Sequence, residues 1–296
     1  MTSNSVADKQ DDKSIQGPTV TSEYSGLRTP DPVLSTQYSA LSSPPSVLAD
    51  SILVLGATSG IARTLSQRLA GRRCRLVLAG RNRDELDREA ADLRLRHNVP
   101  VAVELFDALD FESHASFFAR CVAACDGRLD GVVLCHGYMV DQRQTETDWD
   151  AARRTIDINF TSAVSLLSEA ANHFERQGSG FIAAISSVAG DRGRQSNYTY
   201  GAAKAGLTAF LQGLRNRLHR AGVAVITIKP GFVDTAMTQG IVNPNSPLLV
   251  SPDRVARDID RAIRRRQDVL YTPWFWSPIL RIIRAIPERV FKRLKL

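Results

Sequence analysis

The sequence predicts an α/β fold, a doubly wound parallel sheet in a single domain, flanked by a flexible N-terminal tail and an amphipathic C-terminal extension. Two observations predict it. From residue 51 onward, short aliphatic runs alternate with amphipathic helical segments. The aliphatic runs are apolar on both faces, as strands covered by helices on both sides require. Right-handed crossovers would bring the carboxyl ends of the strands to one edge, where such sheets bind ligands.

The expected elements follow in chain order from the apolar periodicity. Seven runs are expected to form strands: Ile52–Leu55, Cys74–Ala79, Val101–Phe106, Gly131–Cys135, Gly180–Ile185, Val223–Ile228 and Val269–Tyr271. Six segments are expected to form the main helices: Ala62–Ala70, Arg83–His97, Phe111–Cys125, Asp150–Arg176, Tyr200–Arg220 and Pro252–Arg266. Together they place the folded domain at residues 50–272.

Residues 1–49 are expected to be a disordered tail. Ser, Thr and Pro make up 20 of the first 50 residues, and no apolar period runs through them. Burying such a segment would not offset the entropy lost in ordering it. An N-terminal strand hidden in this stretch is the alternative.

Residues 273–296 are expected to form a basic amphipathic segment. It begins with aromatic side chains and continues with Ile279, Leu280, Ile282, Ile283 and Ile286, which we assign to one helical face. Arg281 and Arg284 should point away from that face, and residues 271–296 carry a net charge of +5. Such a helix suits an anionic membrane interface. Packing against a second subunit or across the substrate pocket are the alternatives.

The composition excludes several protein classes. With 43% apolar and 23% charged residues among 296, the chain is neither collagen-like nor a disulfide-rich scaffold. No apolar run reaches the ~18 residues that a membrane span needs, and no export signal begins the chain. Four cysteines without metal-type spacing suggest reduced thiols. We therefore expect no bound metal and a cytoplasmic protein, with peripheral attachment to the inner membrane as an extension of that view.

The net charge of +7 points to anionic partners without choosing among them. Residues 1–50 carry −3, so the remainder carries +10. Nucleic acid is not expected as a partner, because no recognised binding motif and no interleaving of aromatic and basic residues is present.

The loop after the first expected strand reads Gly56-Ala57-Thr58-Ser59-Gly60-Ile61-Ala62 and leads directly into a helix. Gly56 permits a tight turn, Gly60 lets the backbone approach phosphates, and a helix N-terminus favours negative charge. A plain turn is the alternative, but the strand before and the helix after favour a dinucleotide site. Contacts to the dinucleotide are expected from Gly56, Thr58, Ser59, Gly60 and Ile61.

The residues after the second and third expected strands favour NADP(H), with NAD(H) as the alternative. Arg81 stands where an enzyme that binds NAD usually has an acidic side chain, so its guanidinium can receive a 2′-phosphate. A solvated loop arginine is the other reading. Asp107 follows the third strand and is placed to accept a hydrogen bond from the adenine amino group. These features predict a Rossmann-type cofactor site.

A hydroxyl, a phenol and an amine are spaced for acid–base chemistry on a carbonyl. Ser187 follows the fifth expected strand, and Tyr200 and Lys204 lie four residues apart on one face of a helix. A cation beneath the phenol is expected to lower the pKa of Tyr200 from about 10, and Ser187 to hold the substrate oxygen. Taken alone, Tyr200 and Lys204 would be read as an ordinary surface pair.

Together these residues resemble the short-chain dehydrogenase/reductases over about residues 50–272. The resemblance also rests on Asn159 and on Pro230-Gly231. It implies that Asn159 is a fourth catalytic residue, which holds a water that relays protons to Lys204. It further implies cofactor contacts from Tyr200, Lys204, Pro230, Gly231, Val233 and Thr235. Leu134-Cys135-His136-Gly137 departs from the family's Asn-Asn-Ala-Gly, so hydrogen bonds that brace the sheet are lost, and His136 has either a structural role or a place in the site.

A narrower resemblance concerns the substrate. The stretches Ser186–Asn197 and Ile286–Leu294 are similar to those of the decaprenylphosphoryl-2-keto-ribose reductases. This implies reduction of a polyprenyl-phosphate-linked 2-keto pentose to the arabinofuranosyl donor, beside a flavin-dependent oxidase partner. Arg192 and Arg194 would then border the substrate mouth and grip the phosphodiester, with two solvated arginines as the alternative. The family also implies a homodimer or homotetramer.

We therefore expect an NAD(P)H-dependent ketone reductase with this lipid-linked substrate. A reductase of the same chemistry acting on a soluble ketone, such as a sugar, an acyl chain or a secondary metabolite, is the first alternative. A dinucleotide-binding protein without turnover is the second, and the presence of both Tyr200 and Lys204 argues against it.

Overall fold

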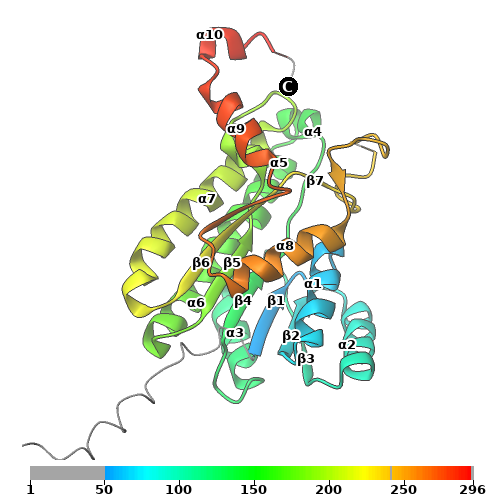
Figure 1. The fold of residues 1–296 in the computed structure, drawn as a ribbon, viewed down its shortest axis with the longest axis vertical. Coiled ribbons are helices and arrows are strands. Elements are labelled where there is room, and N and C mark those ends of the chain that lie inside the picture. Colours follow the sequence, from blue (N-terminus) through cyan, green and yellow to red (C-terminus); the bar gives the residue numbers. More distant parts are fainter. Residues whose placement is uncertain (1–50, 241, 295–296) are drawn as a thin grey trace, which may run out of the picture. The chain divides into compact units, whose positions relative to one another are not determined.

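Seven parallel strands form the central sheet of the computed structural model, which describes residues 51–240 and 242–294 (Figure 1). Their order is β3-β2-β1-β4-β5-β6-β9. The strands are β1 (Ser51–Leu55), β2 (Arg75–Gly80), β3 (Val101–Leu105), β4 (Gly131–Leu134), β5 (Phe181–Ile185), β6 (Ala224–Pro230) and β9 (Val269–Thr272). The predicted doubly wound parallel sheet is confirmed. The predicted tail, residues 1–49, lies outside the described residues.

Helices cover both faces of this sheet. In chain order, the α-helices of the described residues are α1 (Gly60–Gly71), α2 (Arg83–His97), α3 (His114–Ala123), α4 (Gln142–Thr147), α5 (Trp149–Ile156), α6 (Ser162–Gln177), α7 (Tyr198–Leu218), α8 (Pro252–Arg264), α9 (Trp276–Ala285) and α10 (Glu288–Phe291). Apolar side chains of α1, α2 and α8 share one buried core, and those of α3, α6 and α7 share the other. The inner strands β1, β4 and β5 are buried on both faces because each face meets one of these cores.

The order of the strands reverses between β1 and β4, which lie side by side at the centre of the sheet. β2 and β3 extend the sheet from β1, whereas β5, β6 and β9 extend it from β4. The loops that follow β1 and β4 therefore diverge to opposite faces. This divergence opens a crevice at the carboxyl ends of the strands, where the predicted site residues lie.

Three features differ from the elements expected from the sequence. The helix expected over residues 150–176 is broken by a π-helical turn, Asp157–Thr161, between α5 and α6. The short helix α4 was not expected. Neither was the two-stranded sheet of β7 (Phe232–Val233) and β8 (Leu249–Val250), whose strands of two residues are too short to show alternation.

The C-terminal segment docks on the domain through α9. Trp276 and Leu280 are buried there beside Val188. Ile282, however, is 68% exposed, so its assignment to the same apolar face was wrong. At 100° per residue it points about 200° away from Leu280. Arg281 and Arg284 are exposed, as the sequence predicts. None of the helices in the described part combines the length and the apolar character that a membrane span requires.

Candidate active site

The glycine loop after β1 forms one wall of a cavity of about 200 Å³, lined also by Thr58 and Ser59. Gly56 has a φ of +74°, and a Cβ there would lie 2.7 Å from the backbone nitrogen of His136. Glycine is therefore required on two counts, for the left-handed backbone and for the close approach of the chain after β4. The Ser59 side chain caps α1 by accepting from the Ala62 N–H at 3.4 Å. The N-terminus of α1 is thus presented to the cavity, as a phosphate site requires.

Arg81 and Asp107 line the same cavity from the ends of β2 and β3. Asp107 is exposed, and its carboxylate accepts from the Leu109 N–H at 3.0 Å. The Arg81 side chain is exposed and makes no hydrogen bond or ion pair with any residue in the described ranges. The cavity thus carries a cation that is unpaired within the described ranges, and its residues fit a dinucleotide.

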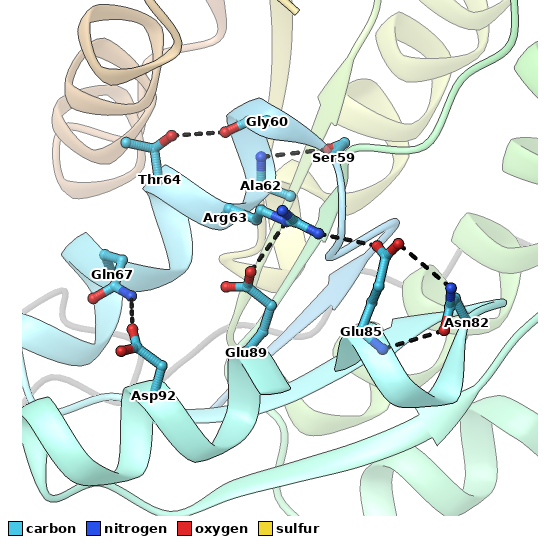
Figure 2. A network of polar contacts seen from close by, with 10 residues as sticks. All are labelled: Ser59, Gly60, Ala62, Arg63, Thr64, Gln67, Asn82, Glu85, Glu89 and Asp92. Atoms are coloured by element: carbon cyan, nitrogen blue, oxygen red, sulfur yellow. Dashed lines mark hydrogen bonds and ion pairs between the residues drawn. The ribbon is translucent and has the colours of Figure 1, made fainter. Parts of the chain in front are cut away.

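A polar network joins α1 to α2, which begins directly after the loop that carries Arg81 (Figure 2). Glu85 lies on the side of α2 that faces α1. Its carboxylate pairs with Arg63 of α1 at 3.0 Å. Arg63 also pairs with Glu89 at 3.1 Å. Asn82 caps α2 by accepting from the Glu85 N–H at 3.2 Å. The cap and the ion pairs fix the start of α2, and Glu85 pairs with Arg63 rather than with Arg81.

Ser187 and Tyr200 meet at a second cavity of about 290 Å³. Ser187 follows β5, and Tyr200 lies in the first turn of α7. Two glycines bring them together: a Cβ on Gly190 would lie 2.7 Å from the Lys204 carbonyl carbon, and one on Gly201 would lie 2.9 Å from the Ala189 oxygen. Because neither has a side chain, the turn that begins at Ser187 packs directly on α7. Ser187 and Tyr200 both line this cavity, and the Ser187 hydroxyl acts to lower the pKa of the Tyr200 phenol.

Lys204 is buried beneath Tyr200. Its Nζ donates to the Ile185 oxygen at 2.9 Å and lies 5.7 Å from the centroid of the Tyr200 ring. Burial lowers the pKa of Lys204 to about 8. It also raises the pKa of Tyr200 to about 12, against the opposing hydrogen bond from Ser187. The expected lowering of the phenol pKa by Lys204 is therefore not found, because desolvation of a phenolate in the cavity wall outweighs a cation at this distance.

Asn159 lies in the π-helical turn and is buried. Its amide oxygen accepts from the Tyr138 N–H at 3.2 Å, and its amide nitrogen donates to the Thr155 oxygen at 2.8 Å and to the Tyr138 oxygen. A Cβ on Gly137 would lie 3.1 Å from the Asn159 oxygen and 3.7 Å from Lys204 Nζ. Asn159 and Lys204 thus flank the backbone at Gly137. Through these bonds Asn159 ties the segment after β4 to the end of α5.

His136 makes a structural contact. Its Nε2 lies 3.0 Å from Ser162 Oγ, which itself donates to the Ile158 oxygen. Because the serine proton is used, the imidazole donates through Nε2 and its Nδ1 is left as a buried acceptor without a partner. Burial lowers the pKa of His136 to about 3, so the ring is neutral. The imidazole supplies a brace between β4 and α6 where the resemblance had implied that bracing hydrogen bonds are lost.

The segment after β6 completes the second cavity. Pro230, Gly231, Val233 and Thr235, which the resemblance assigns to the cofactor, all line it, and so does Ile61 of the glycine loop. A Cβ on Gly231 would lie 1.8 Å from Trp276 Nε1, so α9 packs directly on this segment. Sequence reasoning missed Trp276 as part of the site's support, because nothing in the sequence connects it to Gly231.

The two predicted substrate arginines differ in position. Arg194 lines the second cavity. Arg192 does not: its guanidinium donates to the oxygens of Ile283 (2.9 Å) and Ile286 (2.7 Å), pairs with Glu288 at 2.8 Å and stacks on Phe291. These contacts hold the end of α9 and the start of α10. Apolar wall residues that sequence reasoning also missed, Met139, Val140, Met237 and Val242, lie in loops without periodicity.

Comparisons with known proteins agree with this geometry. A model of the short chain dehydrogenase family matches residues 50–246. An uncharacterized oxidoreductase of Mycobacterium tuberculosis is 37% identical over 246 residues, which cover 83% of this chain and 97% of that protein. One of Streptomyces coelicolor is 36% identical over 247 residues, covering 82% and 95%.

Solved structures share the fold. A short-chain dehydrogenase from Sphingobium yanoikuyae in complex with NADPH has a TM-score of 0.66 at 24% identity, covering 80% of this chain and 96% of that one. A 7β-hydroxysteroid dehydrogenase has a TM-score of 0.71 at 20% identity, covering 83% and 96%. With the family match and the relatives above 30% identity, the chain belongs to the short chain dehydrogenase family and is an NAD(P)-dependent oxidoreductase that acts on CH–OH or C=O groups.

Proposed function

We propose that this protein reduces a ketone with NADPH and that Asn159, Ser187, Tyr200 and Lys204 are its catalytic residues. The observation that carries the proposal is the meeting of Ser187 and Tyr200 in one cavity that the Pro230–Thr235 segment also lines. Ser187 would hold the carbonyl oxygen, and Tyr200 would give it a proton. A pKa of about 12 keeps Tyr200 protonated at neutral pH, which suits a proton donor.

The nicotinamide, when bound, supplies the hydride. Lys204, directly below Tyr200, would stabilise the phenolate left after proton transfer and return a proton to it. Asn159 would hold the backbone around Gly137 so that a water can reach Lys204 from the protein side. Each role uses a contact that the side chain already makes or a group that it already faces.

NADPH is proposed over NADH because Arg81 is unpaired within the described ranges whereas Glu85 is held by Arg63. A charge-assisted contact to a 2′-phosphate contributes about 1.5–3 kcal/mol, or roughly 10- to 100-fold in affinity. Arg81→Gln should therefore lower the ratio of kcat/KM for NADPH over NADH by that factor. Arg88→Gln, an exposed arginine on α2, is the matched control. An unchanged ratio in Arg81→Gln would contradict the assignment.

The proposed substrate is a polyprenyl-phosphate-linked 2-keto pentose, reduced to the arabinofuranosyl donor. Its support is the similarity of residues 186–197 and 286–294 to reductases of that substrate, together with the apolar loops around the cavity. One observation favours a soluble ketone instead: a cavity of about 290 Å³ suits a compact substrate. A lipid-linked substrate would place only its sugar inside.

A membrane contact goes with the lipid-linked substrate. Trp274 and Ile282 are exposed in the same segment as the exposed Arg281 and Arg284, a composition typical of an anionic membrane interface. We accordingly propose peripheral attachment to the cytoplasmic face of the membrane, an oxidase partner that supplies the keto sugar, and a homodimer or homotetramer. These follow from the resemblance and form part of the same proposal.

Oxidation of NADPH under anaerobic conditions by the purified full chain tests the proposal. The polyprenyl-phosphoryl 2-keto pentose should be reduced with a higher kcat/KM than simple soluble ketones, and NADPH should be preferred over NADH. Reduction of soluble ketones alone would select the alternative substrate class. Absence of any ketone reduction, with NADPH binding intact, would overturn the proposed enzyme activity.

A further inference from the structure

The loop between Ser187 and Tyr200 carries three charged side chains. Two of them, Asp191 and Arg192, form ion pairs and hydrogen bonds with other residues of the protein. Arg192 is held by the carbonyls at the end of α9 and by Glu288. Asp191 is held by Lys229 on β6 and by Tyr271 on β9, whose hydroxyl donates to it at 2.7 Å. The Asp191 and Lys229 side chains are only 2% and 7% exposed, so this ion pair is buried.

Arg194 is the charge in the loop that is left over. It is partly buried in the cavity wall with Ser187 and Tyr200. Across residues 51–240 and 242–294, its side chain makes no hydrogen bond or ion pair, and its buried Nε has no acceptor. Such an arrangement is costly, because a desolvated guanidinium does not give up its proton. A buried donor without a partner in a ligand cavity indicates that the ligand supplies the acceptor.

The charges around Arg194 do not supply that acceptor. Asp191 is close enough to favour the charged guanidinium and to oppose the lowering of the Arg194 pKa by burial. Its two carboxylate oxygens, however, are taken by Lys229 and Tyr271. Asp141, the other charged residue of the cavity lining, is exposed and caps α4 by accepting from the Arg143 N–H at 2.8 Å. Neither carboxylate pairs with Arg194, so its guanidinium has no ionic partner among the residues that the structure describes.

We infer that Arg194 is a specificity-determining residue that receives a phosphate group carried by the ketone, and that Lys229 and Tyr271 keep it available by holding Asp191. The inference rests on the proposed reductase function and deepens it by assigning the phosphate of the substrate to Arg194 alone and its availability to the contacts of Asp191. The planar guanidinium matches two phosphate oxygens at once, which a lysine in its place would not do. Arg192, which was expected to share this role, is excluded from it by its contacts with the C-terminal segment.

The first experiment compares three ketones on the full chain: hydroxyacetone, hydroxyacetone phosphate and the dodecyl phosphodiester of hydroxyacetone. Wild-type protein should show a higher kcat/KM for the phosphorylated compounds. In Arg194→Gln, the ratio of kcat/KM for a phosphorylated ketone over hydroxyacetone should fall roughly 10- to 100-fold, as loss of a charge-assisted contact predicts. Arg194→Lys should recover part of it. Arg143→Gln, an exposed arginine on α4, is the matched control and should leave the ratio unchanged.

The second experiment tests the role of Lys229. Lys229→Met leaves Asp191 without its cation, so its carboxylate should turn to Arg194 and the preference for phosphate should be lost. Asp191→Asn with Lys229→Met removes both charges, leaves Arg194 free and should restore the preference. A variant damaged only in stability would lose kcat/KM for hydroxyacetone as well, whereas a lost position of Arg194 lowers only the ratio for the phosphorylated ketones.

The third experiment tests Arg194 even if none of the ketones is reduced. Calorimetry measures the binding of the same three compounds to the NADP⁺-loaded protein. Preference for both phosphorylated compounds that depends on Arg194 supports the inference, and a preference confined to the dodecyl diester assigns the phosphate to a lipid. Equal binding of all three compounds, or a preference that survives in Arg194→Gln, would overturn it. Failure of every ketone to react while Arg194-dependent binding persists would instead refute the reductase proposal alone.

Discussion

At the scale of single residues, Tyr200 has a close internal control. Tyr198 lies in the same first turn of α7 but is exposed, whereas Tyr200 faces Ser187 in the cavity. Tyr200→Phe removes the proposed proton donor and should lower kcat by about 10²- to 10⁴-fold, while the dissociation constant for NADPH changes little. Tyr198→Phe should leave both unchanged. Full turnover in Tyr200→Phe would show that another group protonates the carbonyl.

Lys204 sets a pH dependence whose sign follows from burial. Its pKa is lowered to about 8, so the ammonium is present below pH 8 and is lost as the pH rises through that value. Tyr200, with a pKa of about 12, keeps its proton over the same range. The kcat/KM for ketone reduction should therefore be flat below about pH 8 and fall up to tenfold per pH unit above it. A profile that stays flat to pH 10 would mean that the charge of Lys204 is not needed.

At the scale of elements, the C-terminal helix is built into the wall of the site. Trp276 of α9 fills the space beside Gly231 that a side chain would occupy. Gly231→Ala should force the indole and α9 outward and lower the free energy of unfolding by about 3 kcal/mol. Gly193→Ala, where a Cβ meets no atom within 4 Å, should change it by less than about 0.5 kcal/mol. Chemical denaturation of both variants measures the difference, and equal effects would contradict the packing.

The elements also mark how far the sequence predicts this structure. Aliphatic runs bounded by turns correctly predicted all seven strands of the main sheet. A strand buried in the sheet needs a continuous run of apolar residues, which is easy to recognise in the sequence. The π-helical turn at Asn159 left no such signal, since it arises where the amide of one residue satisfies the backbone of Tyr138 and Thr155. The cofactor loop and the Ser187, Tyr200 and Lys204 positions came from spacing. The contact of Arg192 with α9 joins residues more than 90 positions apart, which no local pattern encodes.

At the scale of the whole molecule, positive charge and exposed apolar groups coincide on the C-terminal segment. Its buried face, with Trp276 and Leu280, is used for docking on the domain. Trp274 and Ile282 are 71% and 68% exposed. The segment thus presents one apolar face inward while leaving an aromatic ring and an isoleucine among arginines outside. An anionic bilayer surface accepts both kinds of group.

Neutralising three of those arginines should therefore detach the protein from membranes without disturbing its site. Arg281, Arg284 and Arg289 are exposed, and each basic residue near an anionic surface contributes about 1 kcal/mol, so their joint change to Gln should weaken binding to phosphatidylserine-containing vesicles about 100-fold. Binding of the unchanged protein should weaken with salt, as screening requires. Three exposed arginines elsewhere, Arg143, Arg176 and Arg220, changed together to Gln, alter the net charge equally and should leave cosedimentation with vesicles intact. If both triple variants lose vesicle binding to the same degree, overall charge is responsible, and the C-terminal segment is not a membrane surface.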